Sequence, residues 1–184
     1  MNYKNYQNAR DAAWRLLIDL NIHTLPVQTT VVCKRLGIAV KLYKPTDGND
    51  GQSFILDDRP VILVSATALP ARQRFTVAHE LGHILLGHVG RYQLANREPD
   101  PGDNPIEQAA NVFASRLLAP ACVLWGCGAR TPEQIVALCG ISHQAAEFRA
   151  ARMEILFQRN KFLASPLERQ VFEQFADYIA ANKL

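Results

Sequence analysis

Apolar residues recur every three or four positions in the first part of the chain, which is the spacing of a helix that buries one face. Residues 6–20 carry such a stripe, and the pattern predicts a helix there. Thr24 with Pro26 is typical of a helix start, and Gly37 of a helix end. We therefore predict a second helix between these positions.

The next segment is typical of short strands separated by turn-forming residues. The candidate strands are residues 38–43, 52–56 and 61–65. Residues 57–60, Asp-Asp-Arg-Pro, join the last two strands as a hairpin turn. Pro60 lacks a backbone N–H, so its place at the start of strand 61–65 favours a position at the edge of the sheet.

Helical patterns dominate the second half of the chain. A helix is expected from Pro70 to Gly87, and another begins at Pro105 and is stopped by Pro120. Ser142 and Ser165 are typical helix N-caps. The remaining predicted helices span residues 132–139, 143–160 and 166–182.

Three strands among many helices predict an α+β fold. We expect a small mixed sheet of about three strands packed on helix 70–87, followed by a helical C-terminal part. The predicted domains are residues 1–125, including the N-terminal helices, and residues 126–184, which pack on them. Within the second domain, residues 131–160 resemble a helix-turn-helix unit.

Composition narrows the class of protein. The chain has 184 residues, 48% of them hydrophobic, and a net charge of +3 with no Lys/Arg run, so nucleic-acid binding is not suggested. The N-terminus lacks the apolar stretch of a signal peptide, and no apolar run is long enough for a membrane span. The four cysteines form no CxxC pair, which favours buried, reduced thiols in a cytoplasmic protein.

The stretch RFTVAHELGHILLGH contains the motif HExxH. His79 and His83 are four residues apart, so on a helix they lie about 40° apart on one face and can bind one zinc ion. Glu80 can accept a proton from a water that the metal activates. The alternative is a buried helix whose histidines are satisfied by hydrogen bonds, but that alternative must also accommodate an ionisable glutamate in an apolar segment.

A catalytic zinc site needs a third protein ligand. His88 would face away from His79 on a continuing helix, and its expected place is the helix C-terminus beside Gly87. Glu107 is the better candidate, because Ala110, Asn111 and Ala114 on the same face allow a close approach of its helix to the HExxH helix. A capping box with Asn104 explains Glu107 equally well, so the residues alone leave both open. Asp100 and Asp103 are lesser candidates.

RQRFTVAHELGHILLGH followed by EQAANVFASRLLAP strongly resembles the ImmA/IrrE family of metallopeptidases. The resemblance covers about residues 52–120 and implies a zincin-like domain with a gluzincin-like metal site, in which Glu107 is the third ligand. The sequence departs from the family pattern at Ala109, where many members have a second glutamate, and at Ala119, where a methionine is usual. The resemblance further implies a zinc endopeptidase that cleaves a helix-turn-helix repressor and so relieves repression of stress, prophage or mobile-element genes.

Several further residues are candidates for the site. Tyr92 and Asn111 could stabilise a developing negative charge or support a metal ligand. An extended substrate could add to the strand formed by Val61, Ile62, Leu63 and Val64. An ordinary sheet strand without substrate explains these residues too. The ligand set suits zinc, but manganese or another divalent metal stays open.

The helix-turn-helix-like segment offers a rival function. If it bound DNA, His143, Gln144 and Glu147 would meet base edges, and Arg149 and Arg152 would lie near phosphates. Acidic residues offset these arginines, so direct DNA binding is not favoured. The alternatives to an enzyme are a regulatory module with a structural metal, which binds DNA or protein, and a toxin–antitoxin component.

Overall fold

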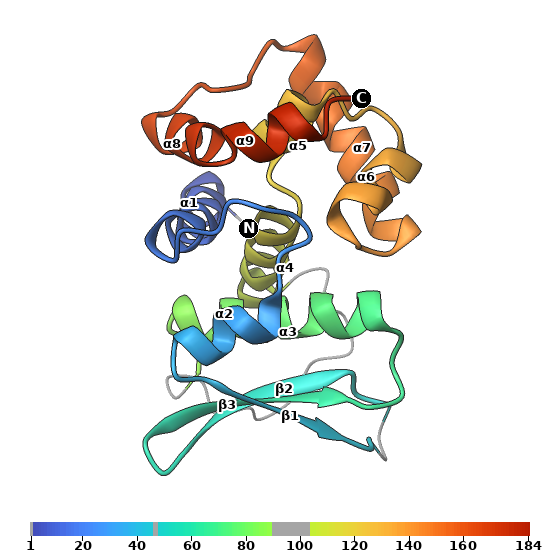
Figure 1. The fold of residues 1–184 in the computed structure, drawn as a ribbon. Helices are drawn as coiled ribbons and strands as arrows, with labels where there is room; N and C mark the ends of the chain where they lie inside the picture. Colours follow the sequence, from blue (N-terminus) through green and yellow to red (C-terminus); the bar gives the residue numbers. More distant parts are fainter. Residues whose placement is uncertain (1, 46–47, 90–103) are drawn as a thin grey trace. The chain divides into compact units, whose positions relative to one another are not determined.

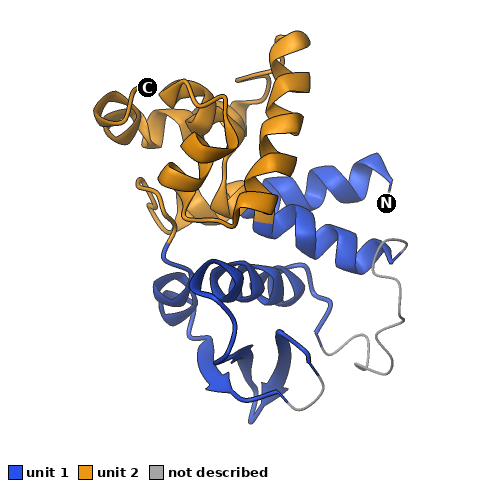
Figure 2. Ribbon diagram, turned by 90° about the vertical axis from the view of Figure 1, so that its right-hand side faces the viewer, with its two compact units in different colours: residues 1–13, 28–114 blue, residues 14–27, 115–184 orange. Residues whose placement is uncertain are grey.

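The computed structural model describes residues 2–45, 48–89 and 104–184. The chain forms two compact units, which Figure 2 colours separately. One comprises residues 1–13 and 28–114, and the other comprises residues 14–27 and 115–184. The predicted domains 1–125 and 126–184 stay a prediction.

The first unit contains a three-stranded mixed sheet, as the sequence predicted. Its strands are β1 (Ala39–Tyr43), β2 (Gly51–Leu56) and β3 (Arg59–Ser65), in the order β1-β3-β2. β3 is parallel to β1 and antiparallel to β2. Helices α2 (Thr29–Arg35) and α3 (Pro70–Leu85) cover one face of this sheet (Figure 1).

The prediction that strand 61–65 lies at the sheet edge was wrong, because β3 is the central strand. Val61 pairs with Ala39 of β1 on one side and with Phe54 of β2 on the other. Pro60 precedes the first residue paired with β1, so its missing N–H removes no bond from the parallel ladder. The proline that suggested an edge is therefore tolerated at the end of a central strand.

The turn between β2 and β3 is shorter than predicted. Asp57 and Asp58 have φ values of 49° and 58°, while Leu56 and Arg59 already pair. Two central residues with positive φ form the tight hairpin turn that matches the twist of antiparallel strands, and aspartate tolerates this backbone region.

The second helix begins later than predicted. Residues 24–28 are not helical, and α2 starts at Thr29. Residues 24–26 form a bend instead, and the peptide bond between Leu25 and Pro26 is cis. The first helix, α1, spans Tyr3–Asp19.

The second unit is helical, as expected of the C-terminal part. It contains the end of α4 (Pro105–Leu118), followed by α5 (Ala121–Cys127), α6 (Pro132–Cys139), α7 (His143–Gln158), α8 (Pro166–Gln174) and α9 (Ala176–Ala181). The predicted caps are confirmed, since Ser142 accepts from the N–H of Ala145 and Ser165 from that of Glu168.

Two features of this unit differ from the prediction. Helix α5 was missed: Pro120 ends α4 but also stands at the N-cap of α5, and Gly128, with φ 80°, ends that helix. The helix expected over 166–182 is divided at Phe175, whose backbone leaves the helical region and whose side chain is fully buried.

The cysteines are buried free thiols, as predicted. Burial raises the pKa of Cys33, Cys122 and Cys139 to about 12, so these thiols stay protonated and unreactive at neutral pH.

One helical stretch of the described residues, Pro105–Cys127, meets the length and composition of a membrane span. Two thirds of its most apolar window (67%) is buried within the protein. That burial is what the core helix of a folded domain shows, so the stretch is weak evidence for a membrane.

Gly51 provides a test of how the sheet packs on α3. A Cβ at this position would lie 2.3 Å from Cγ2 of Thr76 and 2.8 Å from the backbone oxygen of Leu63. We predict that Gly51→Ala lowers the free energy of unfolding by about 1–3 kcal/mol through overpacking. Gln52→Ala on the same strand is the control, and equal urea denaturation curves for the two variants would contradict the packing described.

Candidate active site

Two helices of the first unit bring the candidate ligands together. His79 and His83 lie one turn apart on α3, and Glu107 lies in the first turn of α4. His79 Nε2 is 3.0 Å from His83 Nε2 and 3.2 Å from Glu107 Oε2, and His83 Nε2 is 3.3 Å from Glu107 Oε1. These three side chains form a group that could hold a metal ion.

The close approach of α4 to α3 makes this convergence possible. A Cβ on Gly82 would lie 3.0 Å from Cδ1 of Phe113, so the Phe113 ring packs directly on the α3 backbone at Gly82. Ala110 and Ala114, which the sequence suggested as contacts of small side chains, are fully buried. Sequence analysis missed the contact between Phe113 and Gly82, because no local pattern pairs residues that are 31 positions apart.

The electrostatics of the group favour a cation between the three side chains. Nδ1 of His79 lies 2.9 Å from Oδ1 of Asn111, and an amide oxygen only accepts, so His79 donates from Nδ1 and keeps a lone pair on Nε2. Nε2 of His79 and Nε2 of His83 both face the carboxylate of Glu107, at 3.2 Å and 3.3 Å from its oxygens. A carboxylate and an imidazole lone pair thus face the same small volume.

The distances also fit a tetrahedral ion. Ligand atoms about 2.0–2.1 Å from a tetrahedral zinc are about 3.3–3.4 Å apart. The three distances of 3.0, 3.2 and 3.3 Å are close to that spacing. The residues therefore fit a metal bound by two imidazoles and one carboxylate.

His88 lies beside this group, although the sequence placed it at the helix end. Gly87, with φ 73°, ends α3, and the backbone N–H of His88 donates to the carbonyl of His83. This turn brings Nδ1 of His88 to 3.1 Å from Nδ1 of His83. Burial, and then the charge of His83, lower the pKa of His88 to about 4, which leaves its imidazole neutral at pH 7.

Glu80 is buried on α3 and is held by the sheet. Its Oε2 accepts a hydrogen bond of 2.7 Å from Oγ of Ser53, a buried residue of β2. Gly51, two residues earlier, lies against the same side chain, since a Cβ added to this glycine would be 3.8 Å from Cγ of Glu80. Sequence reasoning missed Ser53, since only strand order and register place it next to the motif glutamate.

The structure places the other predicted residues as follows. Asn104 accepts a hydrogen bond from the N–H of Ile106, as a capping residue does. Tyr92, Asp100 and Asp103 lie outside the described residues. Val61–Val64 belong to the central strand β3, so the prediction that they offer a sheet edge to a substrate was wrong; the edge strands are β1 and β2.

The helix-turn-helix-like segment buries one of the two arginines that were expected near phosphates. Arg149, which was expected near phosphates, is 4% exposed, because it belongs to the buried face of α7 with Ala146 and Met153. His143 is exposed but lies 3.1 Å from Glu133 and 3.4 Å from Glu147. The carboxylates of Glu133 on α6 and Glu147 on α7 would repel a phosphate backbone.

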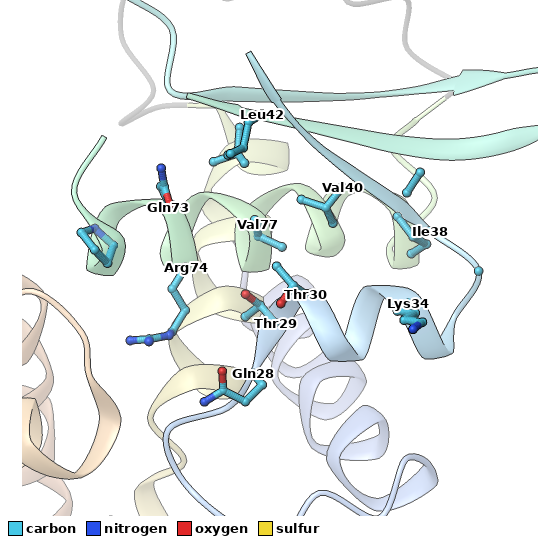
Figure 3. A pocket seen from close by; sticks show the side chains of 14 residues that line it. Gln28, Thr29, Thr30, Lys34, Ile38, Val40, Leu42, Gln73, Arg74 and Val77 are labelled. Carbon is cyan, nitrogen blue, oxygen red and sulfur yellow. The ribbon is translucent and has the colours of Figure 1, made fainter. Parts of the chain in front are cut away.

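A separate cavity of about 720 Å³ lies between α2, β1 and α3 (Figure 3). Val40, Leu42 and Val77 line it together with polar residues such as Gln73 and Arg74. The described candidate ligands are not among its lining residues, so we do not assign the chemistry to it.

Comparison with known proteins identifies the family. The sequence model of the IrrE N-terminal-like domain, a peptidase family, matches residues 33–151, more than half of the chain. This chain belongs to that family. The matched part includes α3, α4 and the helix-turn-helix-like segment as far as residue 151.

Individual relatives match over shorter stretches. The radiation response metalloprotease IrrE of Deinococcus radiodurans is 39% identical over 69 residues, which are 35% of this chain and 20% of that protein. IrrE of Deinococcus deserti is 42% identical over 66 residues, 33% of this chain and 23% of that protein. The match thus spans about a fifth of these relatives.

A solved structure shares the fold. A Mycobacterium tuberculosis transcriptional regulator superposes with a TM-score of 0.57 at 18% identity, over 78% of this chain and 46% of that one. At this identity the likeness concerns the fold alone, and it supports the α+β assignment with a helical C-terminal part.

The contact at Gly82 can be tested by enlarging the residue. We predict that Gly82→Val lowers the melting temperature and weakens metal binding, because the new side chain displaces Phe113 and with it the start of α4. Leu85→Val, at an exposed position of the same helix, is the control. Unchanged metal affinity in Gly82→Val, measured by competition with a chelator, would contradict this role of the contact.

Proposed function

We propose that this chain is a zinc-dependent endopeptidase that hydrolyses a peptide bond in a regulatory protein. The observation that carries the proposal is the convergence of His79 Nε2 and His83 Nε2, 3.0 Å apart, on the carboxylate of Glu107, whose Oε2 and Oε1 lie 3.2 Å and 3.3 Å from them. Family membership supports it, since the matched relatives are named metalloproteases. Two imidazoles and a carboxylate suit zinc better than the all-oxygen sites of magnesium or calcium.

His79, His83 and Glu107 would hold the ion, with Asn111 orienting His79. Zinc bound there supplies Lewis acidity, which acidifies water and polarises a peptide carbonyl. Three protein ligands leave a coordination position for the reaction, whereas a structural zinc closes with four. Among the described residues, three side chains converge in this way.

Glu80 would be the general base. Its carboxylate accepts a proton from the attacking water and passes it to the leaving amine. Ser53 holds the Oε2 oxygen, so the orientation of Glu80 is set before substrate arrives. β2, the edge strand that carries Ser53, is where an extended peptide would add to the sheet.

A helix-turn-helix repressor is the proposed substrate, as the family resemblance implies, and the cell compartment we infer is the cytoplasm, where buried thiols stay reduced. The helical C-terminal part would support the enzyme or dock that repressor. Direct DNA binding is not part of the proposal, because Arg149 is buried and carboxylates flank His143.

The role of Glu80 is tested by its amide. We predict that Glu80→Gln binds zinc with wild-type affinity but cleaves the repressor encoded beside its own gene at least about 100-fold more slowly, since an amide cannot take the proton. Cleavage is followed by mass spectrometry with zinc-loaded protein. A wild-type rate in Glu80→Gln would contradict the role of Glu80 as general base, and cleavage of casein without cleavage of the repressor would contradict the substrate class.

The two interpretations of Glu107 make different predictions. As a ligand, Glu107→Ala loses zinc affinity by at least about 100-fold, because a site of two imidazoles is incomplete. As a cap only, it costs about 1 kcal/mol of stability and leaves zinc binding unchanged. Asn104→Ala is the matched control, and we expect it to lower the melting temperature while zinc affinity, measured by calorimetry, stays the same.

A further inference from the structure

We propose that His88 is a positioning residue for the metal ligand His83, an inference that rests on the proposed metal site. The two rings meet edge to face, with centroids 5.2 Å apart and planes at 65°, and their Nδ1 atoms are 3.1 Å apart. At that distance one Nδ1 donates and the other accepts. The pair therefore fixes which nitrogen of His83 carries the hydrogen.

The direction of the hydrogen bond follows from the position of His83 Nε2. This atom lies 3.0 Å from His79 Nε2 and 3.3 Å from Glu107 Oε1, so it is the atom that faces the candidate metal position. A ligand nitrogen must be unprotonated, so His83 carries its hydrogen on Nδ1 and donates to Nδ1 of His88.

The two histidine ligands then have one outer partner each. Asn111 accepts from Nδ1 of His79 at 2.9 Å, and His88 accepts from Nδ1 of His83 at 3.1 Å. Such partners orient the ring of a ligand and set its tautomer, and their loss typically weakens metal binding about 10- to 100-fold. His88 reaches this place because Gly87 turns the chain back after α3.

The backbone geometry separates this role from that of a helix cap. The main-chain N–H of His88 donates to the carbonyl of His83, and any residue other than proline can make that bond. The side chain is thus available for a different role. His88 also lines a cavity of about 290 Å³, so a side chain of similar size can replace it without overpacking.

Two variants test the acceptor role. His88→Leu keeps the volume and removes the acceptor, whereas His88→Asn places Oδ1 near the position of Nδ1 and keeps it. We expect His88→Leu to bind zinc about 10- to 100-fold more weakly than the wild type, and His88→Asn to stay within about threefold. Affinity is measured with the full chain by competition with a chromophoric chelator, and His143→Asn controls for loss of an exposed histidine.

The visible absorption bands of bound Co2+ are a readout that a merely structural role of His88 would not change. With Co2+ bound, His88→Asn should keep the intensity and position of the visible bands, because the atoms bound to the metal are unchanged. Altered bands in His88→Asn would overturn the inference in favour of His88 as a ligand. Wild-type zinc affinity in His88→Leu, or equal weakening in both variants, would also overturn it.

Zinc binding by the wild type and by His79→Ala distinguishes a failure of this inference from a failure of the proposed metal site. Zinc binding by the wild type that is lost in His79→Ala supports the metal site whatever His88 does. Failure of the wild type to bind zinc would overturn both the site and the role of His88.

Discussion

The contact between Gly82 of α3 and Phe113 of α4 is the constraint on which the site depends. Because Gly82 has no side chain, the aromatic ring packs on the helix backbone, and α4 comes near enough for Glu107 to reach both His79 and His83. A larger residue at position 82 would move the two helices apart. The short side chain of Glu107 would then not reach both histidines. The glycine inside HELGH is thus a packing residue for the site.

Around this contact, the charges of the first unit are arranged for a cation. The carboxylate of Glu107 and an imidazole whose other nitrogen already donates to Asn111 share one small volume. A cation bound between them would accept their lone pairs and offset the charge of the carboxylate. The carboxylate of Glu80, next to His79 in the sequence, accepts its hydrogen bond from Ser53 on β2.

The helical unit has a different character. Helices α6 and α7 reproduce the outline of a helix-turn-helix, but Arg149 is buried, and carboxylates from both helices lie beside His143 at the start of α7. An outline of two helices is decided by packing, whereas DNA binding is decided by which charges remain at the surface.

Local physics determined much of what the sequence alone revealed. Helical periodicity placed His79 and His83 on one face of a helix, and the caps at Ser142 and Ser165 were found because each bond joins residues three apart. Only the tertiary structure decided the strand order, which put β3 in the centre, and the meetings of Ser53 with Glu80 and of Glu107 with the histidines. These contacts join residues 24 to 28 positions apart, and their formation depends on how whole elements pack, which no local pattern encodes.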